Sequence, residues 1–310
     1  MRISTSTLYE QGSAKISDLQ SALVTTQQQL ATGKRMLTPA DDPNAMAQVL
    51  DLTQSQSVNT QFSTNRQTAT TSLSAVDGAL SSATDLLQSL RTLTVTAGNP
   101  NMTSTQLASI AAQFRQGFDS LLSLANATDA SGNYLFGGYH TATPPFVKTS
   151  TVVSGVTVTG AQYVGDQGQR QLQVGSTRQL GISESGQGIF QTGTQDIFKT
   201  LDAFATVLEN PASTPSQITT ALQTANTNIS ATMDNVLTAR ASAGSKLQEL
   251  DSLNSYGSNL DLQYSQSLSS LQDLDYAKAA TKLAQQQTTL QAAQQSFVKI
   301  SNLSLFNYIN

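Results

Sequence analysis

The chain has 310 residues, of which 12% are charged, and 16 Lys and Arg stand against 20 Asp and Glu to give a net charge of −4. This balance leaves no basic field to bind nucleic acid phosphates. The chain has no cysteine and only one histidine, His140, which excludes disulfides, thiolate metal sites and histidine clusters. We therefore expect a protein that is not an enzyme and needs no cofactor or metal.

The opening stretch, MRISTSTLYEQGSAKISDLQ, lacks the apolar segment and small-residue cleavage site of a secretory signal. No window of the chain approaches 18 apolar residues, the length of a membrane-spanning helix. We expect no cleaved signal peptide and no membrane insertion. A cytosolic protein and a protein exported by another route both fit this observation.

Both ends of the chain carry apolar residues at sevenfold spacing, which predicts a narrow seam along one side of a helix. Such a seam must pack against another helix to exclude water. An intramolecular core is one possibility, but Gly12, Thr26, Gly33 and Gln286 interrupt the seams, so we favour packing in an assembly. The predicted assembly seam comprises Tyr9, Ile16, Leu19, Leu23, Leu30, Tyr276, Leu283, Leu290, Phe297, Ile300 and Leu305.

The stretch ATGKRMLTPADDPNAMAQ, residues 31–48, is predicted to be a joint between two helices. Gly33 suits the end of the first helix, and Asp42 suits the N-cap of the second, with Pro43 in the first helical position. Asp41 would lie near the positive end of that helix dipole. The alternative, a catalytic pair of carboxylates at Asp41 and Asp42, is disfavoured because these capping roles explain both residues. Arg35 completes the predicted joint.

The central helices are predicted from apolar residues that alternate steps of three and four, as in Leu73, Val76, Leu80, Ala83 and Leu87. One helix should extend over residues 44–96 and end at Gly98-Asn99-Pro100. Further breaks are expected at Asn210-Pro211 and Thr214-Pro215.

The middle of the chain, residues 132–188, is rich in Gly and β-branched residues and lacks helical periodicity. Within it, YVGDQGQRQLQV (163–174) resembles a hairpin with its turn at residues 165–168. We therefore predict a mainly α protein with an inserted β domain, in which the N- and C-terminal segments form an elongated antiparallel helical rod or coiled coil. The predicted domains are residues 1–40 with 271–310, residues 41–131 with 195–270, and residues 132–194.

Two segments resemble the paired terminal signatures of the flagellin family: QQQLATGKRMLTPADDPNAMAQ (27–48) and LQDLDYAKAATKLAQQQTTLQAAQQSFVKISNLSLFNYIN (271–310). The ends MRIST and LSLFNYIN, with NYLFGG (133–138) and YVGDQGQRQ (163–171), look similar to the members of that family that join hook to filament. The shared signatures leave flagellin itself as an alternative. A stalk that displays an adhesive β domain is a second alternative.

The resemblance implies a structural protein of the bacterial flagellum, exported unfolded through the flagellar secretion channel without signal cleavage. It implies that the terminal helices form an inner tube, the long helices a rod layer, and the β insertion an outer domain. The implied partners are hook-associated protein 1, flagellin, further copies of the chain in a ring, and an export chaperone at the C-terminal helix.

Overall fold

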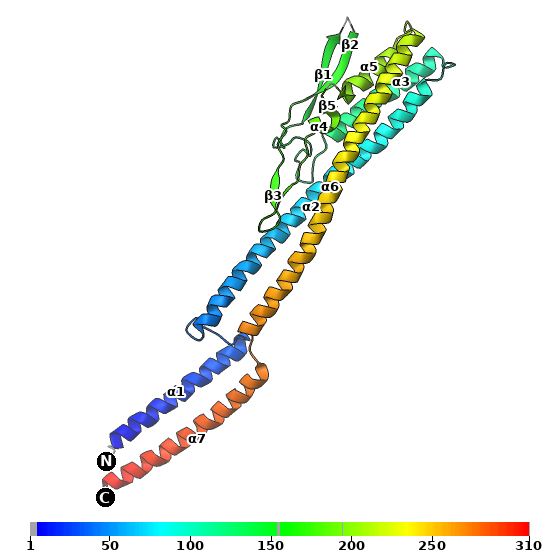
Figure 1. Cartoon of the computed structure of the whole chain (residues 1–310). Helices are drawn as coiled ribbons and strands as arrows, with labels where there is room; N and C mark the ends of the chain where they lie inside the picture. The colour runs from blue at the N-terminus through cyan, green and yellow to red at the C-terminus, as the bar shows by residue number, and fades with distance from the viewer. Residues whose placement is uncertain (1–4, 154–155, 194, 310) are drawn as a thin grey trace. The chain divides into compact units, whose positions relative to one another are not determined.

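The computed structural model describes residues 5–153, 156–193 and 195–309, and helices account for most of these ranges (Figure 1). The helices are α1 (Thr5–Thr32), α2 (Pro43–Ala97), α3 (Ser104–Ala125), α4 (Gln187–Phe190), α5 (Ile197–Glu209), α6 (Pro215–Gln272) and α7 (Tyr276–Ile309). The strands are β1 (Phe146–Val153), β2 (Val156–Tyr163), β3 (Gln171–Gln173), β4 (Gln179–Gly181), β5 (Gln191–Thr192) and β6 (Gln195–Asp196). They form three antiparallel pairs, β1–β2, β3–β4 and β5–β6.

The predicted helix boundaries are confirmed. Helix α2 continues to Ala97, immediately before Gly98, and α5 ends at Glu209, before Asn210 and Pro211. Helix α6 begins at Pro215, and the hydroxyl of Thr214 accepts a hydrogen bond of 3.3 Å from the amide of Gln217. Proline thus stands in the first position of α6, where a missing amide hydrogen costs nothing.

Many threonine hydroxyls in the long helices donate a hydrogen bond to a carbonyl of their own helix. Thr94 and Thr232, 2% and 3% exposed, donate to the carbonyls of Leu90 and Asn228 four residues earlier, at 2.9 and 2.8 Å. A buried hydroxyl with such a partner carries little penalty. This is how a sequence rich in Ser and Thr forms packed helices.

The packing divides the chain into two compact units, Met1–Asn59 with Ser258–Asn310, and Thr60–Gly257. These boundaries fall inside α2 and α6. The predicted three-part division has its boundaries elsewhere, near residues 40 and 271, and stays a prediction.

In the unit Thr60–Gly257, the long helices α2 and α6 run antiparallel. The side chains of Arg66 and Asn254 meet at 2.7 Å, and those of Asp77 and Arg240 at 3.0 Å. Helices α3 and α5 pack against each other through two edge-to-face ring pairs, Phe114 with Phe204 and Phe118 with Phe198, and share a buried apolar cluster with α2 and α6. The seam residues Leu73, Val76, Leu80, Ala83, Leu87 and Leu90 are all at most 2% exposed.

The β region shares its core with these helices, because Phe146 of β1 contacts both Phe198 of α5 and Phe190 of α4, with ring centroids 5.3 and 5.7 Å apart. Phe136 and Ala161 are buried in the same cluster as the α3 and α5 phenylalanines. The predicted fold class, mainly α with antiparallel long helices and an inserted β region, is confirmed.

The predicted hairpin over residues 163–174 is wrong. Strand β2 ends at Tyr163 and pairs with β1, the strand before it in the chain. Strand β3 pairs with β4, the strand after it, so β2 and β3 do not form a hairpin with each other. The segment between them is held by other bonds, since the Asp166 carboxylate accepts from the amides of Tyr139 and Gly168, at 2.9 and 2.7 Å. The bond from Tyr139, a residue of an earlier loop, and the local bond from Gly168 thus hold this segment in place of the predicted hairpin.

In the unit Met1–Asn59 with Ser258–Asn310, α1 and α7 lie side by side and antiparallel (Figure 1). Tyr9 meets Phe297 near the terminal ends of the pair, and Gly33 faces Tyr276 at the other end. A small apolar cluster lies beyond these helices, where the start of α2 meets the end of α6. It comprises Met36, Ala45, Met46, Val49, Leu268 and Leu271.

Candidate assembly site

The predicted seam residues of α1 and α7 lie on the facing sides of the two helices, but they are only half-buried. This holds for Ile16, Leu19, Leu23 and Leu30 on α1 and for Leu283, Leu290 and Phe297 on α7. By contrast, the seam leucines of α2 are almost fully covered. The α1–α7 pair alone therefore leaves much of its apolar seam in contact with water.

Three predicted seam residues are more exposed than the others. Tyr9 is 57% exposed, although its ring centroid lies 5.0 Å from that of Phe297, and Tyr276 is 58% exposed at the start of α7. Ile300 is 55% exposed. The side chain of Leu305 lies outside the residues that the structure describes.

Small residues complete the seam between the larger apolar side chains. Thr26 is 1% exposed, and its hydroxyl donates to the carbonyl of Ala22 at 3.0 Å. Ala279 is 5% exposed on α7. A Cβ atom at Gly12 would lie 2.7 Å from the ring of Phe297, so glycine makes room for that ring. The sequence signal was therefore present, since glycine and threonine fell on the seam where they looked like interruptions.

Gly33 ends α1 in the left-handed conformation, with φ of +68°, which favours glycine. A Cβ atom there would lie 2.7 Å from the hydroxyl oxygen of Tyr276. The carbonyl of Gly33 accepts a hydrogen bond of 2.9 Å from the amide of Leu274, and the amide of Arg35 donates to the carbonyl of Gln272 at 2.7 Å. The connection from α1 to α2 therefore pairs with the connection from α6 to α7.

Arg35 joins three parts of this paired connection. Its guanidinium lies 3.4 Å from the carboxylate of Asp42 and donates to the carbonyl of Leu271 at 3.1 Å. Its own carbonyl accepts a bond of 2.7 Å from the side chain of Gln29 on α1. The basic residue of the joint thus contacts α1, the start of α2 and the end of α6.

The two aspartates of the joint have separate roles. One oxygen of Asp41 accepts from the amides of Leu37 and Thr38, each at 2.8 Å, and these bonds hold the pKa of Asp41 below its ordinary value. Asp42 accepts a bond of 3.1 Å from the amide of Ala45 in the first turn of α2, and Pro43 is the first residue of that helix. Each carboxylate therefore binds backbone amides, at a turn and at a helix start.

The corresponding cap of α7 was not among the predicted site residues. Asp275 accepts a bond of 3.1 Å from the amide of Lys278, and that bond lowers the pKa of Asp275. The sequence held the signal in LQDLDY, where an aspartate directly precedes the first residue of α7. The backbone of Asp273, two residues earlier, forms an isolated antiparallel β-bridge with Lys34. The sequence alone gave no reason to pair these distant residues.

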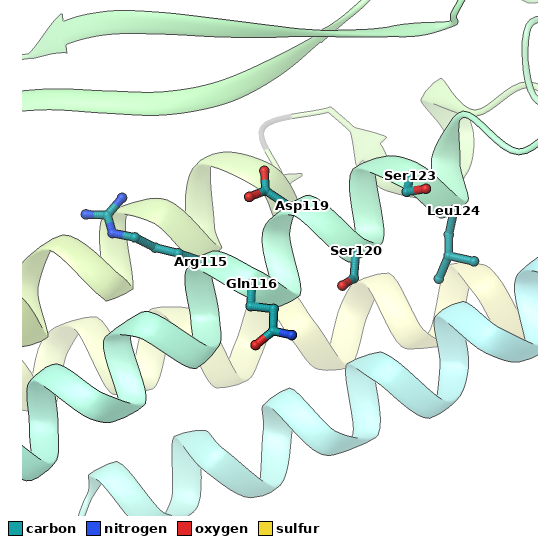
Figure 2. A pocket seen from close by; sticks show the side chains of 6 residues that line it. All are labelled: Arg115, Gln116, Asp119, Ser120, Ser123 and Leu124. Carbon is teal, nitrogen blue, oxygen red and sulfur yellow. The ribbon is translucent and has the colours of Figure 1, made fainter.

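An open pocket on the outer side of α3 lies in the other unit, and the side chains that line it all come from that helix (Figure 2). Two of its charged groups are already paired: Arg115 with Asp202 and Glu209, and Asp119 with Lys148. Within the described part of the chain, no three His, Cys, Asp or Glu side chains gather as metal ligands. Nor does any helix in those ranges have the length and apolar character needed to cross a membrane.

The family model described as bacterial flagellin N-terminal helical region matches residues 3–141. The chain is 33% identical to flagellar hook-associated protein 3 of Escherichia coli, over 99% of each chain. The chain belongs to the flagellar hook-associated protein 3 family. Membership in this family makes it a structural component of the bacterial flagellum.

Solved structures share the fold of this family member. A flagellar hook-associated protein from Vibrio parahaemolyticus has a TM-score of 0.67 at 24% identity, over 75% of this chain and 100% of that one. The flagellar junction protein FlgL from Legionella pneumophila has a TM-score of 0.57 at 17% identity, over 73% and 100% of the two chains. At these identities the likeness concerns the fold alone.

Proposed function

We propose that this chain joins the flagellar hook, through hook-associated protein 1, to the flagellin filament. The observation that carries the proposal is the 33% identity with a flagellar hook-associated protein 3 over nearly the whole of both chains. One protein of the same fold is a flagellar junction protein. Further copies of this chain would complete a ring between the two partners.

The half-covered seam of α1 and α7 supports axial packing between subunits. Besides the seam, these helices expose apolar side chains in Val24 and Val298, which are 49% and 56% exposed. Burying apolar area contributes about 25 cal/mol per Å². Neighbouring subunits that cover these residues would therefore gain stability that the isolated α1–α7 pair lacks.

The same proposal assigns a place to each segment of the chain. Residues 1–40 and 271–310 form the inner tube, residues 41–131 and 195–270 the rod layer, and residues 132–194 the outer domain. The subunit reaches its place through the flagellar secretion channel without signal cleavage, and an export chaperone holds α7 until then. The support for these assignments is the likeness of the terminal segments to those of the flagellin family.

A structural rather than enzymatic role fits the surroundings of the single histidine. The His140 side chain is 64% exposed in a loop and lies 4.0 Å from the carboxylate of Asp166. That carboxylate already accepts bonds from two backbone amides. In the part of the chain that the structure describes, neither side chain is hydrogen-bonded to a serine or threonine hydroxyl, so the loop is better suited to stabilising the β region than to acid–base chemistry.

The test is complementation of a host strain from which this gene has been deleted. The deleted strain should shed flagellin into the medium, and the wild-type gene should restore filaments. Leu19→Asp and Leu290→Asp, which place charges in the seam, should fail to restore them. Val147→Asp, at a residue of β1 that is 46% exposed, is the matched control and should succeed.

Three outcomes would overturn the proposal. Normal filaments on the deleted strain would remove the junction role. Long filaments grown by the purified subunit alone would favour a flagellin. Deletion of residues 140–190 that keeps motility but abolishes attachment to surfaces would favour the adhesive stalk.

A further inference from the structure

Arg66 is a buried cation in the unit Thr60–Gly257. It is 4% exposed, and burial lowers the pKa of its guanidinium. Its Nε donates to the side-chain oxygen of Asn254 at 2.7 Å, and its Nη1 donates to the carbonyl of Val174 at 3.1 Å. No carboxylate of the described residues lies within 4.0 Å of it, so neutral oxygens alone hold the charge.

Arg66 and Asn254 both occupy positions of the seam between α2 and α6. On α2, Arg66 lies three residues before Ala69, which lies four residues before Leu73, and both of those side chains are 0% exposed. On α6, Asn254 follows the equally buried Leu250 by four residues. The two polar residues therefore face each other at one end of a row of buried apolar ones.

An arrangement of this kind is not explained by stability alone. A buried charge loses its hydration, and replacing a whole buried ion pair by apolar residues of similar volume is often neutral or stabilising, so burial of charge is weak evidence for a role in stability. A polar side chain at a seam position of paired helices instead selects one register at a cost in stability. Arg66 has that position, and its partner lies on the opposite helix.

The apolar residues of the seam would tolerate a change of register. The buried residues of α2 from Ala69 to Leu90 repeat with steps of four and three, and those of α6 include Ala225, Ile229, Thr232 and Val236 with the same steps. A slip of seven residues, about 10 Å along the helix, again brings apolar rows together. The slip would separate Arg66 from both Asn254 and Val174, and in one direction the guanidinium would face Leu247.

We propose that Arg66 and Asn254 fix the register of α2 against α6. The carbonyl of Val174 extends this function to the β3–β4 pair, because it ties the end of β3 to the same guanidinium. Asn65, the preceding residue, donates to the carbonyl of Gln173 at 2.7 Å. Two consecutive residues of α2 thus bind two consecutive carbonyls, and a slipped α2 would lose all of these bonds.

Cysteine cross-linking in the full chain tests the proposal, since the chain has no cysteine of its own. Asp77→Cys with Arg240→Cys reports the native register. Asp77→Cys with Met233→Cys or with Leu247→Cys, seven residues to either side of position 240, reports a slip. A short thiol-to-thiol cross-linker and mass spectrometry measure the yield of each pair.

In the wild-type background we expect the native cross-link to dominate. Arg66→Met should keep the helical circular dichroism but raise the yield of a slipped cross-link at least tenfold. Arg178→Met is the matched control: it removes an arginine of the same unit that pairs with Glu249, and the two side chains are 53% and 33% exposed, unlike the buried Arg66. That control should leave the slipped yield at the wild-type level.

Equal slipped yields in Arg66→Met and in wild type would overturn the proposal. If Arg66→Met unfolds, the double variant Arg66→Met with Asn254→Leu decides the question, because it leaves no unpaired amide in the seam. A slipped cross-link in the double variant supports the proposal. Unfolding of both variants would show that the pair acts in stability rather than in register.

Discussion

The amide of Thr159 in β2 donates a hydrogen bond of 2.6 Å to the carboxylate of Asp202 in α5. Asp202 is only 4% exposed. The other carboxylate oxygen lies 2.7 Å from the guanidinium of Arg115 in α3. One buried side chain therefore connects the β1–β2 hairpin with two helices. Its removal would leave the amide of Thr159 without this partner and Arg115 with Glu209 alone.

Asp202→Ala should destabilise the unit Thr60–Gly257 by about 2 to 3 kcal/mol, because hydrogen bonds to a buried charge are lost and Arg115 keeps only Glu209. Urea unfolding followed by circular dichroism measures the effect. Lys148→Ala is the control, since it breaks an ion pair with Asp119 in which both side chains are more than half exposed. That variant should cost no more than about 1 kcal/mol, and equal losses in the two variants would contradict the assigned role of Asp202.

Gly33→Ala should destabilise the joint for two reasons. The left-handed backbone costs a residue with a Cβ about 1 to 2 kcal/mol, and the new methyl group would displace the Tyr276 hydroxyl. Gly132→Ala is a matched control, because its φ is +82° but a Cβ there meets nothing within 4 Å. Urea unfolding and hydrogen exchange of α1 and α7 measure the difference between the two. Tyr276→Phe should reduce that difference, and no reduction would assign the whole cost to the backbone.

The stability of the joint should depend on acid pH. Backbone hydrogen bonds, from Thr38 and Leu37 to Asp41 and from Lys278 to Asp275, hold the pKa of both carboxyls below the ordinary value of 3.8. A carboxyl whose pKa is lower in the folded state contributes stability above its unfolded pKa, and this is lost as pH falls through the folded pKa. We therefore expect the free energy of unfolding to decrease as the pH falls below about 4.

The double variant Asp41→Asn with Asp275→Asn should flatten this pH dependence, measured by urea unfolding at several pH values. Asp51→Asn with Asp85→Asn is the control, because it removes the same number of carboxylates from exposed positions of α2. A control curve as flat as that of the test variant would attribute the pH dependence to net charge instead of to the caps.

Leucine-to-alanine substitutions should distinguish residues of the folded core from residues of the proposed assembly seam. Leu87→Ala, at a residue that is 0% exposed, should cost about 2 to 5 kcal/mol in the isolated subunit. Leu19→Ala, at the half-buried seam, should cost about 1 kcal/mol there but should reduce assembly in the complementation experiment. Equal costs in the isolated subunit would show that α1 and α7 form an ordinary intramolecular core.

The sequence predicted the helices well because their signals are local. Proline at positions 100, 211 and 215 limits the helices, and the steps of three and four residues from Leu73 to Leu90 identify the buried side of α2. The predicted cap residue Asp42 accepts from the amide of Ala45 for the same reason, since capping involves neighbours in the chain. Periodicity and breakers report what happens within a few residues.

Pairing between distant segments was not predictable in the same way. The turn residues 165–168 suggested a hairpin, but Tyr163 pairs with Phe146, whose ring packs on Phe198 of α5. That aromatic packing depends on helices that come before and after the β region in the chain. Similarly, nothing in the local sequence around Gly33 indicated that its carbonyl would accept from Leu274.

The paired connection at Gly33 and Leu274 has a mechanical consequence. The chain leaves α1 and returns into α7 through segments that are bonded to each other, from Gly33 to Leu274 and from Arg35 to Gln272. A torque or a pull applied to one terminal helix is therefore transmitted through these hydrogen bonds to the connection of the other helix. Neither connection can bend without straining the other. In a rotating organelle, the two helices would carry load as a pair.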